Sequence, residues 1–164
     1  MDAAQSSGAG MVMATDVLGL ERARDVASRV VDPEIPVLTI ADLGILRGVR
    51  VDGHRVMAII TPTYSGCPAM LQIAADLRSA LGAAGFDEVE VETIHDPPWT
   101  TDWITPEGID KLASFGIAPP GDEIVCPKCQ SGSARVVSRF GSTACKALMA
   151  CTSCGEPFDH FKDF

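Results

Sequence analysis

The sequence predicts an α+β fold, with a small mixed sheet that carries two helices on one face and a C-terminal β zinc ribbon. Three observations support this expectation. Apolar residues recur at three- and four-residue steps in two stretches, β-branched residues dominate three others, and two CxxC pairs lie near the C-terminus. The order helix, strand, strand, helix, strand is typical of a compact domain whose helices cover one face of its sheet.

The first helix is expected over residues 17–30, where apolar side chains recur along one helical face and Asp16 precedes them as an N-cap. We expect residues 1–16 to be a short disordered leader rather than a signal peptide, because no basic segment leads an apolar one. Pro33 and Pro36 then disfavour helix in DPEIPVLTIADLG, which we expect to be extended or turning.

Two strands and a second helix follow. The β-branched runs GILRGVRV and HRVMAIITPT meet around Asp52-Gly53, and this dipeptide between two such runs is a strong hairpin signal. The second helix is expected just after the cysteine of SGCPAM, over residues 70–81, and the glycines of LGAAGF end it. VEVETI alternates as a third strand, so the first domain is expected to span residues 17–94.

Residues 95–121 are expected to form an ordered extension that ends in a linker. Thr105 is placed to cap a short helix that has Pro106 at its first position. Two consecutive prolines and Gly121 then mark the linker. The remaining segment, residues 122–164, is the expected zinc ribbon.

Four of the six cysteines form the two CxxC pairs of this ribbon. A two-residue spacer lets both thiolates of a pair face one ion, and two such pairs complete the tetrahedral site of a structural zinc. Iron in the same four-sulfur cage is the main alternative, since tetrahedral sulfur suits both metals. A segment this short buries little core, so the metal would supply much of its folding free energy. The expected ligands are Cys126, Cys129, Cys151 and Cys154.

Composition and charge narrow the classes of function. The chain has 13 Lys+Arg against 22 Asp+Glu and a net charge of -9, which works against binding a phosphate backbone, so nucleic acid is not an expected partner. No apolar run is long enough to span a bilayer, and we expect a cytoplasmic protein without a membrane partner. In a reducing compartment, six cysteines indicate metal ligation or thiol chemistry rather than disulfides.

Cys67 stands apart from the other cysteines, between Gly66 and Pro68 at the expected start of the second helix. Free backbone N–H groups and the helix dipole at such a position stabilise a thiolate and lower its pKa. A lone cysteine is commonly a small buried hydrophobe, so a packed thiol and a reactive or metal-handling thiol both stay open. A cysteine hydrolase would need a base, and folding would have to bring His54 or His95 to the thiol.

Two residues of the ribbon are left outside the expected zinc site. Cys145 is expected to be a packed or unligated thiol, with ligand exchange or sensing as the alternative. His160 is expected at the surface, because four cysteines already complete a tetrahedral site.

Longer motifs carry a family resemblance. DPEIPVLTIADLG followed by TPTYSGCPAM resembles the small iron-sulfur cluster assembly domain of metal-sulfur cluster maturation factors. With HDPPWTTDWITPEG, CPKC, FGSTACKAL and CGEPFDHFK added, nearly all of the chain after residue 17 is similar to the D-subunit family of the phenylacetyl-CoA oxygenase (1,2-phenylacetyl-CoA epoxidase) system. The combination of assembly domain and ribbon is more specific than either motif alone.

The resemblance implies an accessory factor, not an enzyme, that assists insertion of iron or an iron-sulfur cluster into partner subunits during phenylacetate degradation. The implied partners are the reductase and the di-iron component of the oxygenase, and a homo-oligomer stays open. By motif match, Cys67 corresponds to the family's reactive cysteine and Asp42 to its acidic position, which together would hold iron transiently. The alternative for Asp42 is a turn or capping residue.

Two rival functions stay open at this stage. One is a structural or regulatory subunit that only scaffolds the oxygenase complex, and the other is electron transfer through iron in the four-cysteine site. The aromatic tail of the ribbon offers apolar anchors for a partner, although the same rings could instead pack the ribbon onto the first domain. These rings are Phe158, Phe161 and Phe164.

Overall fold

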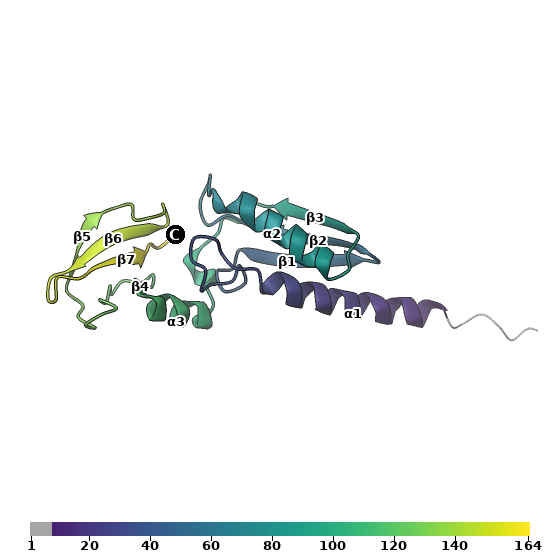
Figure 1. Ribbon diagram of the computed structural model, residues 1–164, viewed down its shortest axis with the longest axis horizontal. Helices are drawn as coiled ribbons and strands as arrows, with labels where there is room; N and C mark the ends of the chain where they lie inside the picture. The colour runs from purple at the N-terminus through teal and green to yellow at the C-terminus, as the bar shows by residue number, and fades with distance from the viewer. Residues whose placement is uncertain (1–7) are drawn as a thin grey trace, which may run out of the picture.

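The computed structural model describes residues 8–164, and in that range the chain forms two sheets joined by a helical extension (Figure 1). The strand order is β1-β2-β3 in the first sheet and β4-β7-β6-β5 in the second. Along the chain the elements are α1 (Gly8–Ser28), β1 (Leu46–Asp52), β2 (Arg55–Ile60), α2 (Ala69–Ala83), β3 (Glu88–Thr93), the short 3-10 helix η1 (Thr101–Trp103), α3 (Pro106–Phe115), β4 (Ile117–Ala118), β5 (Ala134–Ser138), β6 (Lys146–Cys151) and β7 (Pro157–Phe161).

The first helix, α1, begins earlier than the sequence pattern predicts. Residues 8–16, expected in a disordered leader, are helical, and Asp16 lies inside the helix instead of capping it. No proline interrupts GMVMAT, and its two methionines and its alanine are good helix formers, which is consistent with a helix that extends toward the N-terminus. Residues 1–7 lie outside the described range, so the leader stays a prediction for them.

The first sheet combines a hairpin with a parallel strand. β1 and β2 are antiparallel, with Asp52 opposite Arg55, and β3 pairs in parallel with β2. The turn residues are therefore Gly53 and His54, and Gly53 has the positive φ of 59° that a two-residue hairpin favours. Alternate residues of β2 are fully buried, and both helices pack on that face. The predicted α+β fold with its mixed sheet is confirmed.

The second helix, α2, starts at Ala69, directly after Cys67 and Pro68. Its buried stripe contains Ile73 and Leu77 at helical spacing, and these side chains join the core beneath the sheet. The sequence-based expectation that Cys67 lies where a strand gives way to a helix is therefore correct. Pro68 is the N-cap residue rather than the first helical residue.

The extension packs against the turn formed by ADLG. The Trp99 Nε1–H donates to the Leu43 carbonyl at 2.8 Å. Gly44 has a φ of 67°, and a Cβ at this position would lie 2.6 Å from the Trp103 Cβ, so the close approach requires glycine. α3 then begins as predicted, with the Thr105 hydroxyl accepting a hydrogen bond from a backbone N–H of the first turn.

The second sheet is attached to the first domain by more than its linker. β4 pairs in parallel with β7, so the extension contributes a strand to the ribbon sheet, which a two-residue segment before two prolines does not reveal in the sequence. The Trp99 ring lies 6.2 Å from the Phe161 ring and 6.1 Å from the Phe164 ring. Phe161 is 1% exposed and belongs to the core of the first domain, so the two sheets share part of one core.

None of the helices that residues 8–164 form is long and apolar enough to cross a membrane.

Candidate functional site

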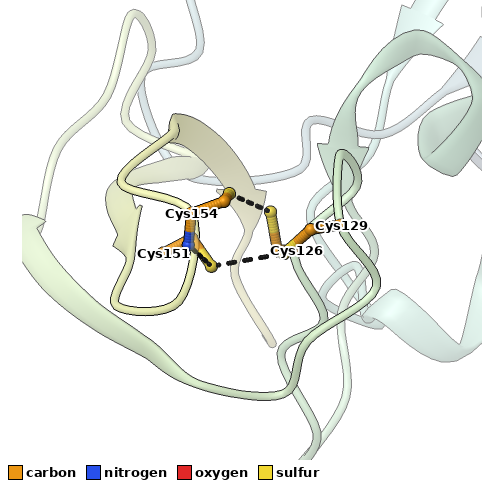
Figure 2. Close-up of side chains that lie close together, drawn as sticks. All are labelled: Cys126, Cys129, Cys151 and Cys154. Carbon is orange, nitrogen blue, oxygen red and sulfur yellow. Dashed lines mark hydrogen bonds between the residues drawn. The ribbon is translucent and has the colours of Figure 1, made fainter.

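The four cysteines of the CxxC pairs converge at one end of the ribbon (Figure 2). All four sulfur atoms lie within 4.8 Å of one another. The Cys126 Sγ is 3.8 Å from the Cys154 Sγ, and the Cys129 Sγ is 3.6 Å from the Cys151 Sγ. Sulfurs that are each about 2.3 Å from a tetrahedral zinc lie about 3.8 Å apart, so these thiols fit one such ion. The four cysteines form a metal site.

The two knuckles that present these thiols have matching backbones. The Cys126 carbonyl accepts from the Gln130 N–H at 2.9 Å, and the Cys151 carbonyl accepts from the Gly155 N–H at 3.0 Å. The residue that closes each turn has positive φ, 60° at Gln130 and 78° at Gly155. The second knuckle has a glycine at this position, whereas the first holds a glutamine in the left-handed conformation that favours glycine.

The four thiols of this site differ in protonation, because a backbone N–H favours the Cys129 thiolate but the neighbouring cysteines outweigh it and raise the pKa of Cys129 to about 12. Backbone N–H groups of Cys154 and Ser153 lower the pKa of Cys151 to about 6. Lys128 of the first knuckle pairs with Glu156 beside the second, which ties the two together. The Lys128 ammonium also lies near the thiols, and so offsets part of the charge that four thiolates bring to a divalent ion.

Cys67 has a different setting, and its predicted pKa shift was wrong in sign. The backbone N–H of Ala69 at the start of α2 favours the thiolate, as expected of a helix end. Burial, the largest effect, and the negative charges of Glu34, Asp32 and Cys145 outweigh it and raise the pKa of Cys67. The half-buried thiol is therefore protonated at neutral pH unless a cation is brought to it.

Asp42 is a capping residue, which was the alternative weighed for it. Its Oδ2 accepts the Thr39 N–H at 2.9 Å, and its own N–H donates to the Thr39 hydroxyl at 3.0 Å. Lys111 of α3 places its ammonium 2.8 Å from the same oxygen. Partial burial opposes ionisation, but the hydrogen bonds from Lys111 and Thr39 prevail and lower the pKa of Asp42. Its carboxylate thus fastens the ADLG turn to α3, and a role of Asp42 beside Cys67 stays a prediction.

The acids whose charges act on Cys67 come from the DPEIP segment, whose prolines alone predict only an extended or turning loop. Asp32 is buried, and its Oδ1 accepts the N–H groups of Glu34 and Ile35 at 2.9 and 2.7 Å. Burial raises the pKa of both carboxyl groups, and at Glu34 the charge of Asp32 adds to it. The two acids stand next to prolines in the motif, but only the folded chain shows that their charges reach Cys67.

The aromatic tail and His160 are placed differently from the predictions. Phe158 lies in the ribbon core and Phe161 in the shared core, so a docking role for these two rings was wrong, and packing is the reason for their burial. Phe164 is 45% exposed, and docking stays a proposal for it. His160 is 6% exposed rather than at the surface, because β4 covers it and the Ala118 carbonyl lies 3.3 Å from its Nδ1.

A cavity of about 380 Å³ lies beside the loop that carries Cys67. Its walls come from the start of that loop, from the HDPPW segment and from the C-terminus, with Tyr64, His95 and Phe164 among the lining residues. His54, by contrast, is exposed near Asp87 at the far hairpin turn. Only His95 of the two weighed histidines therefore lies beside the loop of Cys67.

Comparison with known proteins follows the same division of the chain. The family described as "Iron-sulfur cluster assembly protein" matches residues 20–93, and the family described as "PaaD zinc beta ribbon domain" matches residues 115–162. The second range includes β4 as well as the cysteine ribbon.

A protein from Escherichia coli strain K12, named provisionally as the D subunit of 1,2-phenylacetyl-CoA epoxidase, is 48% identical over 144 residues, which cover 82% of this chain and 87% of that protein. A crystal structure of a domain of unknown function, DUF59, from Bacillus anthracis matches with a TM-score of 0.51 and 25% identity, covering 64% of this chain and 97% of that one. A conserved hypothetical protein from Thermotoga maritima matches with 31% identity and a TM-score of 0.48, covering 56% and 91% of the two chains.

Proposed function

The chain belongs to the D-subunit family of 1,2-phenylacetyl-CoA epoxidase, and we propose on this basis that it is an accessory maturation factor for that oxygenase. It assists the insertion of iron or an iron-sulfur cluster into partner subunits of the phenylacetate degradation pathway, and it does not catalyse the epoxidation itself. The two matched families, one of cluster assembly proteins and one of zinc ribbons, support a division of labour between the two modules.

The observation that carries the proposal is the setting of Cys67. This thiol is half-buried at the start of α2, and the charges of Glu34 and Asp32 act on it. The same negative field that keeps the thiol protonated attracts a cation, and binding of a cation replaces the proton. A site that is acidic, thiol-bearing and only half covered is suited to holding a metal briefly and releasing it.

The ribbon has the opposite task in this proposal, because its four cysteines hold a structural zinc. Zinc prefers a closed set of four thiolates, and the sulfur spacing fits that geometry. Binding of the ion contributes folding free energy on the order of 10 kcal/mol to modules of this kind. The ribbon zinc stabilises the second sheet and takes no part in transfer.

The proposed recipients are the reductase and di-iron subunits of the oxygenase. A recipient must reach Cys67, and the cavity beside its loop gives a hollow for docking, with Phe164 and Tyr64 in its wall. Phe164 is the exposed ring of the aromatic tail, so we place recipient docking at this cavity.

The test is to co-express the chain with the oxygenase subunits and to measure iron in the purified partners. We expect Cys67→Ser to lower partner iron and oxygenase activity while this protein stays folded with one zinc per chain. Ser79→Ala, a change at an exposed residue of α2 outside the wall of this cavity, is the matched control and should load the partners normally. Full partner loading with Cys67→Ser would overturn the proposal.

A second candidate is a scaffolding subunit that remains in the oxygenase complex, because the Escherichia coli relative is named as a subunit. This alternative predicts co-purification with the other subunits at fixed stoichiometry, and it predicts that Cys67→Ser has no effect on partner iron. A transient factor is instead absent from the mature complex.

A further inference from the structure

Cys145 is a second thiol that the ribbon zinc site does not use. It lies directly before β6, whereas Cys151 of the zinc site ends the same strand. A strand rises about 3.3 Å per residue, so these two cysteines are separated by about 20 Å. Cys145 therefore cannot exchange with the ligands of the ribbon zinc.

Cys145 instead belongs to the first domain by its packing. It is 5% exposed and lies in the same buried cluster as Ile35 and Ala69, whereas Cys126 and Cys151 lie in the separate ribbon core. Ile35 directly follows Glu34 in sequence, and the same cluster is contacted by Cys67. Figure 1 shows the ribbon sheet at the end of the first sheet where the α1–β1 connection also lies. Three segments far apart in sequence thus contribute to one buried cluster, which contains Cys145 and is contacted by Cys67.

The charges of the residues near the two thiols also act on one another. Glu34 acts on both thiols, and Cys145 acts on Cys67. Burial and then the charges of Cys67, Glu34 and Cys145 raise the pKa of Tyr64 to about 12, so a fourth group faces the same centre. The two cysteines and Glu34 therefore lie near enough for their charges to interact, in an acidic and partly buried environment.

The carboxylate of Glu34 is available to a ligand. Within residues 8–164 no hydrogen bond or ion pair engages it, whereas backbone N–H groups occupy Asp32. Lys146, 4% exposed, is the positive group that faces this cluster, and its ammonium lies 3.4 Å from Asp159. Binding one divalent cation with loss of both thiol protons leaves the formal charge of the cluster unchanged, so the buried ammonium need not move.

We propose that Cys67, Cys145 and the Glu34 carboxylate form a two-thiol site for a borderline divalent cation such as Fe²⁺, built between the first domain and the ribbon. This inference rests on the proposed function, since it names the second thiol and the class of cation held at Cys67. Thiolates suit soft metals and carboxylates suit hard ones, so the mixed set suits a borderline cation. Three protein ligands leave a fourth position open, where a ligand from the recipient enters.

The site is not closed before the cation binds. In the part of the chain that the structure describes, only the ribbon cysteines bring three or more ligand atoms within 4.8 Å of one another. The Cys67 site must therefore contract around its ion, and this rearrangement lowers its affinity below that of the ribbon site. A weaker, open site is what transfer requires.

The test uses Co²⁺ as the probe and full-length protein that already carries zinc in the ribbon. Under anaerobic conditions, Co²⁺ should produce a thiolate-to-metal charge-transfer band in the wild type. Cys67→Ser and Cys145→Ser should each weaken Co²⁺ binding by at least about tenfold, and Glu34→Gln by less. Glu107→Gln, which alters an exposed carboxylate near Lys111, is the matched control and should bind like the wild type.

X-ray absorption at the cobalt edge of the wild type gives a second measurement that does not depend on the folding of variants. It should count two sulfur ligands and additional oxygen ligands. A single sulfur, or Co²⁺ binding by Cys145→Ser equal to that of the wild type, would overturn the two-thiol site while leaving partner loading by Cys67 to be judged by its own experiment. Absence of a Cys67-dependent band would overturn it as well.

Discussion

The ribbon cysteines and Cys67 are thiols in the same chain with opposite surroundings. In the ribbon, four sulfurs lie within 4.8 Å of one another, and backbone N–H groups favour the thiolate of Cys151. Among the described residues, the possible ligand atoms around Cys67 do not come this close together, and burial and the charges of acidic neighbours keep the thiol protonated. A preformed site of the first kind retains its metal for stability, whereas an unformed acidic site can accept a metal and give it up.

Removal of the ribbon zinc should have the largest effect. A strong chelator, or Cys126→Ser, should unfold the ribbon, because metal binding of this kind contributes on the order of 10 kcal/mol to folding. Hydrogen exchange of residues 122–164 and thermal unfolding would measure the loss. Cys67→Ser is the control and should keep both zinc and ribbon protection, and persistent protection after complete zinc loss would contradict the assignment.

Phe161→Ala should have the second largest effect on stability. It removes packing between the ribbon and the first domain and leaves both sets of thiols unchanged. The ring is 1% exposed and packs against Trp99, so its removal should cost about 3–5 kcal/mol in the free energy of unfolding. Zinc content should stay at one per chain, since the knuckles lie at the other end of the sheet. Phe140→Ala, at an exposed ring of the ribbon, is the control for chemical denaturation and should change stability little.

Glu34→Gln should increase the fraction of Cys67 that is present as thiolate. The Glu34 charge raises the pKa of Cys67, so its removal lowers that pKa and increases the thiolate fraction at any pH below it. Alkylation of Cys67 by iodoacetamide, followed by mass spectrometry from about pH 7 to about pH 10, should therefore become faster, while zinc protects the ribbon thiols. An unchanged pH profile would mean that burial alone sets the protonation of Cys67.

The smallest predicted changes in stability come from substitutions in the two knuckles. Gln130→Gly should raise the free energy of unfolding by about 1 kcal/mol, and Gly155→Ala should lower it by about 1–2 kcal/mol, because both positions have positive φ. The Gln130 amide donates to the Pro127 carbonyl at 3.2 Å, which offsets part of the gain. Denaturant unfolding with zinc present would measure both changes, and a loss of stability in Gln130→Gly would show that the side-chain bond outweighs the strain.

Local spacing explains what the sequence predicts well. The CxxC pairs, the Asp52-Gly53 hairpin and the Thr105-Pro106 helix start each depend on residues a few positions apart, and all three occur in the fold. Local patterns fail where a long-range contact decides. The sign of the Cys67 pKa shift depends in part on acids that are far from it in sequence. The Asp42 carboxylate forms an ion pair with Lys111, which belongs to a later helix.

The ribbon also shows why burial is hard to predict from a tail of aromatic residues. Aromatic rings at intervals along a tail are consistent with an exposed docking surface and also with a packed strand. Phe161 is buried because it packs against Trp99, which is far from it in sequence. The two-residue β4 gives no periodic signal, yet it buries His160. Cys145 is likewise inconspicuous in sequence and becomes informative only beside Cys67.

A transfer measurement with purified components tests the proposed role of Cys67 without relying on cells. Zinc-loaded protein carrying one additional Fe²⁺ is mixed anaerobically with iron-free oxygenase subunits, and iron in the subunits is followed over time. We predict faster loading than from the same concentration of free Fe²⁺, an advantage that Cys67→Ser abolishes while the ribbon zinc stays in place. Equal loading rates with wild type, Cys67→Ser and free Fe²⁺ would contradict metal delivery by this protein.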